Sequence, residues 1–277
     1  MEITLTPIGL GPWSHTKLKA LKNCPLQFYL KYIVKYPVAT RPIQLVTEVG
    51  KAAHKIIELM IEGSFILDAF DQTKKIFERT ITPEEWETNV KILEFNITEF
   101  QRKLTDFSNR YNVVKVNQEL RLACTIDWKP TSFFAKDVYF RGITDFSLEL
   151  DNGDIIVIDH KTGGDKAYGV RSFKDQLDTY KVLFHKGCKP ITGAQTGIHF
   201  IKAGELIFDE YSEADEIDKK LIPKLEFRIS SIVDSVRFLG KFKHIAGSHC
   251  EYCDFKESCK AGKLKEIEED SKKWFNK

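Results

Sequence analysis

The sequence has 277 residues, of which 42% are hydrophobic and 30% are charged. This balance is typical of a globular protein and excludes wholesale disorder, and the length suits one large domain or two small ones. No apolar run approaches the ~20 residues that a membrane-spanning helix needs, and the first residues lack the basic and apolar regions of a secretory signal. We therefore expect a cytoplasmic protein without a membrane partner.

The net charge of +2 is small, but it is unevenly distributed. Residues 1–55 contain eight Lys and Arg against two Asp and Glu, a balance of +6, which leaves −4 for the rest of the chain. A basic segment of this kind suits contact with phosphate groups, although a solvated helix face would have the same composition.

Residues 1–110 are expected to be mainly helical. Ser14 or Thr16 can cap a first helix, and Pro25 suits the first turn of a second. Further helices are expected at about 42–62, 66–80 and 83–108. The last carries an apolar stripe in alternating steps of four and three, typical of a buried helix face or a short coiled-coil seam: Trp86, Val90, Leu93, Ile97, Phe100, Leu104 and Phe107.

The hydrophobic period then changes to two, which indicates strands. Residues 113–126 read as a half-buried strand with its apolar residues at even positions from Val114 to Ile126, and with Glu119 on the polar face. Strands at 138–150 and 154–161 flank Asp151-Asn152-Gly153, which is strong hairpin-turn chemistry. A helix at about 171–186, a strand at 196–201 and a long helix at 214–239 follow.

These elements predict an α/β fold, with a small central mixed β-sheet flanked by helices. We expect one domain over residues 1–277, comprising a helical N-terminal part, a core at 111–202 and a C-terminal part at 203–277.

The strongest candidate site is the acidic hairpin. Gly142-Ile143-Thr144-Asp145 lies on one strand, and an apolar run on the next strand leads into Asp159-His160-Lys161-Thr162-Gly163. Because strand side chains alternate, Asp159 and Lys161 point the same way. Carboxylates suit a divalent cation, and a lysine beside it can serve a metal-bound water. The simpler alternative is a surface ion pair at a strand end.

Two helical pairs add to this pattern. Gly50 and His54 are four residues apart, so His54 could be a further metal ligand, although a lone helical histidine is more often structural. Gln176 and Tyr180 are also four apart, on the helix after the hairpin, where they could instead form an amphipathic boundary.

The chain has six cysteines and no secretory signal, so a disulfide framework is not expected. Cys250, Cys253 and Cys259 lie within ten residues, which indicates a bound metal. Cys124 falls on an apolar strand face and Cys188 in a turn, outside this pattern.

In their order along the chain, these motifs resemble the PD-(D/E)xK nuclease superfamily and, within it, the RecB-like exonucleases. The resemblance implies a restriction-endonuclease-like core and hydrolysis of DNA phosphodiester bonds. It also implies a Mg²⁺ or Mn²⁺ site formed by His54, Asp145, Asp159 and the backbone carbonyl of His160. Glu119 would be a further acid, although no spacing rule defines its place.

The remaining roles follow from the same resemblance. Lys161 would serve the attacking water, while Gln176 and Tyr180 would steady the lysine and the DNA. The basic residues Lys17, Lys19 and Lys22 would follow the DNA backbone, together with Tyr180.

Cys24 with Cys250-x2-Cys253-x5-Cys259 resembles the iron–sulfur staple of the CRISPR-associated exonucleases and of the AddB nuclease domain. Four thiolates suit a [4Fe–4S] cluster, and Zn²⁺ is the alternative because it also accepts four cysteines. The staple would hold the basic N-terminal helices over the nuclease cleft.

We therefore expect a metal-dependent DNA exonuclease that prefers single-stranded ends. The chain has no Gly-x4-Gly-Lys-Ser/Thr loop, so a helicase, or a recombination or adaptation protein, would be a separate partner. The alternatives are a DNA-end-binding scaffold with little catalysis and a zinc-stapled endonuclease.

Overall fold

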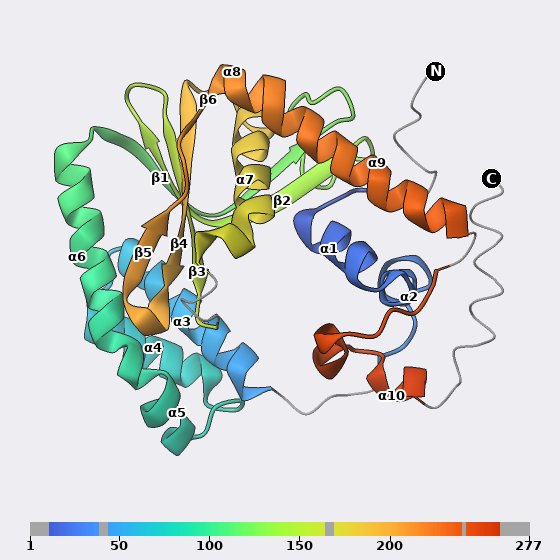
Figure 1. Cartoon of the computed structure of the whole chain (residues 1–277). Helices are drawn as coiled ribbons and strands as arrows, with labels where there is room; N and C mark the ends of the chain where they lie inside the picture. Colours follow the sequence, from blue (N-terminus) through green and yellow to red (C-terminus); the bar gives the residue numbers. More distant parts are fainter. Residues whose placement is uncertain (1–10, 39–43, 164–168, 240–241, 261–277) are drawn as a thin grey trace.

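A computed structural model describes residues 11–38, 44–163, 169–239 and 242–260 (Figure 1). Its centre is a six-stranded mixed sheet in the order β1-β2-β3-β4-β5, with β6 also paired to β4. The strands are β1 (Val113–Cys124), β2 (Phe140–Leu150), β3 (Ile155–Lys161), β4 (Gly193–Phe200), β5 (Glu205–Phe208) and β6 (Ser212–Glu213).

The sheet is antiparallel except for one pair. β1, β2 and β3 form an antiparallel meander, β3 and β4 are parallel, and β4 pairs antiparallel with β5 and β6. The predicted turn between β2 and β3 is confirmed: Gly153 has a φ of +85°, which favours glycine. The parallel pair requires a crossover, which α7 (Lys174–Gly187) provides.

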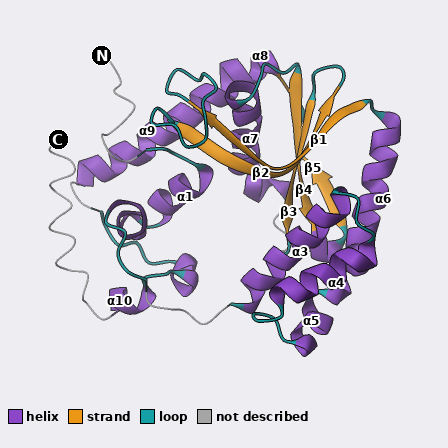
Figure 2. Ribbon diagram, turned by 180° about the vertical axis from the view of Figure 1, so that it is seen from behind, coloured by secondary structure: helices purple, strands orange, loops and turns teal. Residues whose placement is uncertain are grey.

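Helices cover both faces of the sheet (Figure 2). On one side lie α3 (Leu45–Ile61), α4 (Ile66–Phe77), α5 (Pro83–Asn89) and α6 (Glu94–Arg110). Their buried residues form one core with Phe146, Leu148, Ile156 and Ile158 of the sheet. The predicted start of the third helix, Pro42, lies outside the described residues.

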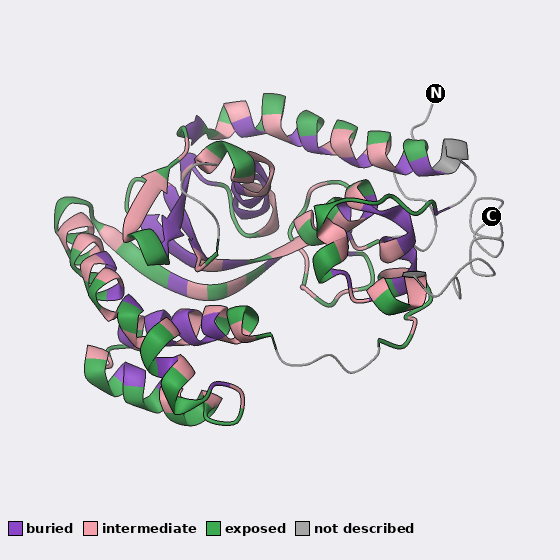
Figure 3. Cartoon of the chain, turned by 60° about the horizontal axis from the view of Figure 1, so that its bottom comes forward, coloured by how far each residue is buried: buried purple, intermediate pink, exposed green. Residues whose placement is uncertain are grey.

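The other face carries α7 and α9 (Ile222–Leu239), which follows α8 (Ala214–Glu216) and a π-helical turn. Figure 3 shows that α9 is buried along one side and exposed along the other. Its buried residues Leu225, Ile229 and Val233 share a second core with Ile155 and Val157 of β3. Alternate residues of β3 therefore enter opposite cores, as expected for a strand covered on both faces.

The N-terminal helices belong to this second core. Ser14 caps α1 (His15–Asn23), because its side chain accepts the Lys17 N–H at 3.2 Å. α2 (Pro25–Phe28) continues into a π-helical turn at Tyr29–Ile33.

The segment after α9, including α10 (Lys256–Lys260), packs against α1 and α2 (Figure 1). The Leu26 N–H donates to the Lys243 carbonyl at 3.2 Å, and Tyr29 stacks on Phe242 with ring centres 4.8 Å apart. Two stretches far apart in the sequence are thus held side by side.

The predicted helix at 83–108 is broken. α5 ends at Asn89, a 3-10 turn covers Lys91–Leu93, and α6 starts at Glu94. The predicted stripe is nevertheless buried from Trp86 to Phe100. A 3-10 helix has three residues per turn. Apolar residues spaced by three or four therefore stay on one side of the chain, although the helix axis changes direction.

β1 also departs from the expected pattern, because its even-numbered residues do not share one environment. Val114 and Val116 are 62% and 47% exposed, and Val116 borders a hollow with residues of α3 and α6. Leu122 and Cys124 are instead buried in the core beneath α7. Between the two halves lies Glu119, whose φ of +46° interrupts the regular strand.

Candidate metal centre and cysteine cavity

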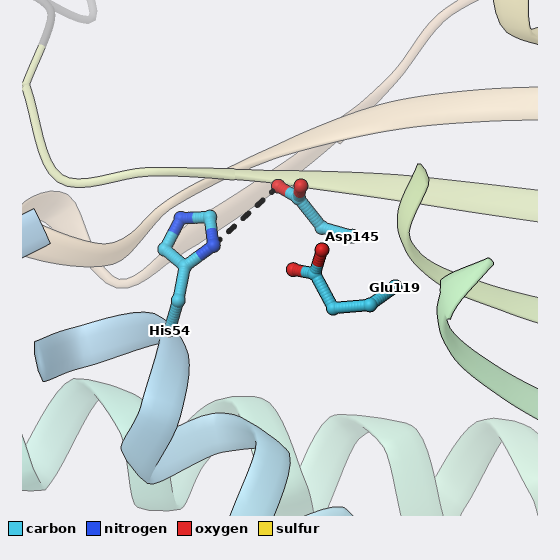
Figure 4. Close-up of side chains that lie close together, drawn as sticks. All are labelled: His54, Glu119 and Asp145. Carbon is cyan, nitrogen blue, oxygen red and sulfur yellow. Dashed lines mark ion pairs between the residues drawn. The ribbon is translucent and has the colours of Figure 1, made fainter. Parts of the chain in front are cut away.

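Three side chains from three elements point toward one another (Figure 4). They are His54 of α3, Glu119 of β1 and Asp145 of β2, and their ligand atoms all lie within 4.8 Å of one another. We call these residues the metal group. Ligands on opposite sides of Mg²⁺ are about 4.2 Å apart, since each lies 2.0–2.1 Å from the ion. The metal group therefore fits one hard cation with little rearrangement.

The orientation of His54 is set by its other ring nitrogen. Its Nε2 lies 3.0 Å from the His160 carbonyl oxygen, so this nitrogen carries the proton and donates. Nδ1 is then left with a lone pair, 3.8 Å from Asp145 Oδ2. A backbone carbonyl behind a histidine in this way is the usual support of a metal-binding imidazole. The His160 carbonyl, itself an expected metal ligand, here accepts from His54.

Gly50 allows α3 to come this close to the hairpin. A Cβ atom at Gly50 would lie 3.1 Å from Thr162 Oγ1, just beyond β3. Gly142 has the same effect on the other side, where a Cβ atom would lie 2.6 Å from the Leu183 side chain of α7.

The environment of the Asp145 carboxylate raises its pKa. Burial raises its pKa to about 6, and the charge of Asp159 adds to this, while His54, the His160 N–H and Lys161 act in the opposite direction. The His160 N–H donates to Asp145 Oδ2 at 2.8 Å. A cation at this position would favour the ionised carboxylate, so the raised pKa is consistent with a metal ligand.

Asp159 is not part of the metal group within 4.8 Å. Its Oδ1 instead accepts from Gln176 Nε2 and from the Tyr180 hydroxyl, both at 2.9 Å, and Lys161 Nζ lies 2.5 Å from its Oδ2. Burial raises the pKa of Tyr180 well above its usual value and Asp159 raises it further, so this hydroxyl is a neutral donor. The structure thus brings the four residues Asp159, Lys161, Gln176 and Tyr180 into one contact network.

Glu119 reaches the metal group through an irregular backbone. The β1–β2 pairing runs from Gln118 with Phe146 to Leu120 with Thr144, and it passes over Glu119 and Asp145 between them. A positive φ at a residue other than glycine costs about 1–3 kcal/mol, and such residues cluster at active sites. The regular alternation of the sequence could not indicate this distortion.

A buried histidine pair lies behind the hairpin. His160 Nδ1 is 3.0 Å from His199 Nδ1, and Phe100 stacks on His199 with ring centres 4.3 Å apart. Burial lowers the pKa of both rings, to about 3 for His199. Sequence reasoning did not single out His199; its only signal was a polar residue within an apolar strand, on the strand parallel to β3.

All four cysteines of the expected staple line one cavity of about 330 Å³, between α1–α2 and the segment around α10. We call it the cysteine cavity; its thiols belong to Cys24, Cys250, Cys253 and Cys259. Burial raises the pKa of the Cys253 thiol, and nearby Cys24 and Cys250 raise it further. Cys124 is instead buried in the core, and Cys188 is exposed.

Four cysteines around one cavity suit either of two occupants. A [4Fe–4S] cluster takes four thiolates, and zinc also accepts four cysteines in a tetrahedral site.

Two of the three lysines expected to contact DNA share one groove. Lys19 and Lys22 are exposed and border it together with Asp175 and Arg228. Lys17 does not line this groove; it is half-buried and donates to the Pro12 carbonyl at 3.0 Å.

With the fold and site described, comparison with known proteins identifies the class. Residues 12–260 match the PD-(D/E)XK nuclease superfamily, and the chain belongs to that family. No curated protein was found to match. The fold resembles that of a candidate exonuclease from Eubacterium rectale, with a TM-score of 0.52 and 13% identity over 92% of this chain and 90% of that one.

A second solved structure, that of SSO0001, has 18% identity over 89% of this chain and 95% of that one, with a TM-score of 0.34. No helix among the described residues is long and apolar enough to cross a membrane.

Proposed function

We propose that this nuclease is a Mg²⁺- or Mn²⁺-dependent DNA exonuclease that acts on single-stranded ends and carries a structural [4Fe–4S] cluster. One observation carries the catalytic part of the proposal. The metal group lies beside Asp159, whose carboxylate is paired with Lys161 at 2.5 Å. The family assignment and the candidate exonuclease of similar fold support hydrolysis of a nucleic acid.

The residues divide into cation ligands and a lysine with its supports. His54, Glu119 and Asp145 would hold the cation, with the carboxylates ionised and His54 offering Nδ1. When bound, the cation polarises the phosphate and lowers the pKa of a water. Lys161 donates hydrogen bonds to the attacking water or to a phosphate oxygen. The Lys161 ammonium is paired with Asp159. The pair keeps a positive charge beside the metal group, where the phosphate would bind.

Gln176 and Tyr180 act on the lysine through Asp159. Both donate to the same oxygen, Oδ1, which orients Oδ2 toward Lys161. Gln176 Nε2 also donates to the Tyr180 oxygen at 2.8 Å, so the two side chains hold each other in place. They are positioning residues, and their loss should slow the reaction less than the loss of Lys161.

The cysteine cavity would hold the [4Fe–4S] cluster. Four thiols around one cavity are the ligand set that such a cluster takes. The cluster would join Cys24 to Cys250 across 226 residues. By analogy with a covalent crosslink, this is worth on the order of 5 kcal/mol, depending on the treatment of the unfolded chain.

A cleavage assay on linear and circular strands tests the function. End-labelled single-stranded DNA and a closed single-stranded circle would be incubated with Mg²⁺, Mn²⁺ or chelator. We expect metal-dependent loss of the linear strand from its end and survival of the circle. Equal cleavage of the circle would identify an endonuclease, and tight end binding without cleavage would identify a scaffold.

A further inference from the structure

Two phenylalanine rings meet on the loop between β1 and β2, one of them exposed and the other half-buried. Phe134 is 72% exposed, and its ring meets that of Phe133 edge-on with centres 5.1 Å apart. One exposed phenylalanine is unremarkable on a protein surface. The side chains around this pair are what distinguish it.

Two arginines from the adjoining strands lie over these rings. The guanidinium carbon of Arg121 is 5.9 Å from the centre of Phe133 and 5.7 Å from that of Phe134. That of Arg141 is 4.8 Å from the centre of Phe133. Arg141 Nη1 also donates to the Phe133 carbonyl at 3.0 Å, which ties the loop to β2. We call Arg121, Phe133, Phe134 and Arg141 the aromatic platform.

The charge of the platform is available to an anion. Neither arginine forms an ion pair with an acidic side chain among the described residues. A further positive charge lies nearby, because Lys17 of α1 is close enough to Arg141 for the two charges to repel. The acids of the loop do not cancel this charge: Asp127 and Asp137 are matched in number by Lys129 and Lys136.

The platform is connected to the metal group by the same two strands. Arg121 lies two residues beyond Glu119 in β1, and Arg141 lies four residues before Asp145 in β2. At ≈ 3.3 Å per residue, these separations are roughly 7 and 13 Å along the strands. Ile143, between Arg141 and Asp145, is 38% exposed, so this stretch of surface is open to solvent.

We propose that the aromatic platform stacks unpaired bases of a single DNA strand whose backbone continues to the metal group. Stacking needs an exposed π-face and the phosphates need positive charge, and the platform offers both. In a duplex the bases are already stacked on each other, so a flat aromatic ring favours a single strand. The inference rests on the proposed nuclease function and adds a determinant of strand preference to it.

Equilibrium binding of a fluorescent single strand, in chelator to prevent cleavage, tests the platform. Phe134→Ala should weaken binding roughly 5- to 100-fold, whereas Phe134→Trp should restore it. Phe95→Ala is the matched control, because Phe95 is 74% exposed on α6, far along the chain from the platform. It should bind as the unaltered protein does. Binding of a blunt duplex should change little in all three variants.

Salt dependence separates the two kinds of platform residue. Arg121→Gln should reduce the slope of log K against log salt by about 0.7, the value for one phosphate contact on a single strand. Phe134→Ala should leave the slope unchanged, because stacking releases no counterion. A fluorescent base analogue scanned along the strand should be quenched at a position a few nucleotides from the reacting phosphate, and this quenching should disappear in Phe134→Ala.

The outcomes separate the platform from the nuclease function. If Phe134→Ala binds and cleaves single strands normally, the proposed stacking role of the aromatic platform is wrong and the proposed nuclease function stands. The opposite result is an unaltered protein that cleaves no DNA under any metal condition while Phe134→Ala still loses single-strand binding. The proposed nuclease function would then be wrong, and the stacking role of the aromatic platform would be supported. Equal losses for the single strand and the duplex would overturn the stacking role.

Discussion

The metal group and the cysteine cavity are assembled in opposite ways. The metal group takes oxygen and nitrogen ligands from β1 and β2 of the sheet and from α3, which packs against it. These ligand atoms lie within 4.8 Å of one another. The cysteine cavity takes sulfur ligands from Cys24 and from residues 250–259 and spreads them around about 330 Å³. The first site is embedded in the fold, whereas the second joins segments that are distant in the sequence.

Because of this difference, we expect the metal group to support activity and the cysteine cavity to support stability. Emptying the metal group should remove activity and leave the fold, because the sheet and two cores hold its residues. Emptying the cysteine cavity should weaken the fold, because the bound group would crosslink two segments that are distant in the sequence. In both, burial disfavours the charged form: it raises the pKa of Asp145 and of Cys253. A bound cation or cluster would offset this cost.

The sharpest test of the comparison is Lys161→Ala. Cleavage should fall by about 10²–10³-fold, the usual cost of removing one hydrogen-bond donor that acts in the transition state. Single-strand affinity should change little, since one charge among many phosphate contacts is a small loss. Lys219→Ala, an exposed lysine of the turn after α8, is the control. Undiminished hydrolysis by Lys161→Ala would remove Lys161 from the site.

Cys250→Ser tests the cavity. The free energy of unfolding should fall by about 2–5 kcal/mol, by analogy with the loss of a native crosslink. Iron and sulfide analysis of anaerobically purified protein should give four of each per chain, and the brown colour should be lost in the variant. Cys188→Ser, at an exposed cysteine outside the cavity, should keep both colour and stability. Colourless unaltered protein with one zinc per chain would contradict the iron–sulfur proposal.

The pH dependence of metal binding provides a third, smaller effect. Because the pKa of Asp145 is raised to about 6 without metal, protons should compete with the cation below that pH. Affinity for Mn²⁺ should fall by about tenfold per pH unit below 6, and level off above it. Titration calorimetry between pH 5 and pH 8 would measure this. A flat profile down to pH 5 would show that Asp145 is not a ligand, and Asp145→Asn should bind weakly at every pH.

The smallest expected effect comes from Gly50→Ala. Alanine favours a helix by ~1 kcal/mol over glycine, but the added Cβ would lie 3.1 Å from Thr162 Oγ1. We expect stability close to that of the unaltered protein and a several-fold loss of activity, because α3 and His54 shift away from the hairpin. In the double variant Gly50→Ala, Thr162→Gly the contacting Oγ1 is absent, so activity should return, whereas a loss of activity that persists would show that this contact is not the cause.

Sequence reasoning anticipated the parts of this molecule that depend on local pattern. The alternation around Asp151-Asn152-Gly153 predicted β2, β3 and their turn, and the Fe–S resemblance brought together cysteines that the structure places around one cavity. The burial of Trp86 through Phe100 was also predicted, although the break at Lys91–Leu93 was not. A stripe with steps of three and four does not distinguish a straight helix from one with a 3-10 turn.

The missed features depend on tertiary structure. Nothing in the residues around Glu119 indicates a left-handed backbone, so the interruption of β1 could not be predicted, although the resemblance had indicated Glu119 as a further acid of the site. The hydrogen bonds from Gln176 and Tyr180 to the Asp159 carboxylate depend on how α7 packs beside the end of β3. Likewise, His199 meets His160 only because β4 lies parallel to β3.

The order of synthesis gives the cysteine cavity a further consequence. Cys24 emerges from the ribosome long before Cys250: 226 residues separate them, which takes roughly 10–45 s at 5–20 residues per second. During that interval α1 and α2 have no partner from the segment around α10, and Leu26, Tyr29 and the Cys24 thiol stay uncovered. A chain that stops short of Cys250 keeps this surface exposed, where chaperones and proteases can recognise it. Closure of the cavity therefore requires that the chain has been synthesised at least as far as Cys259.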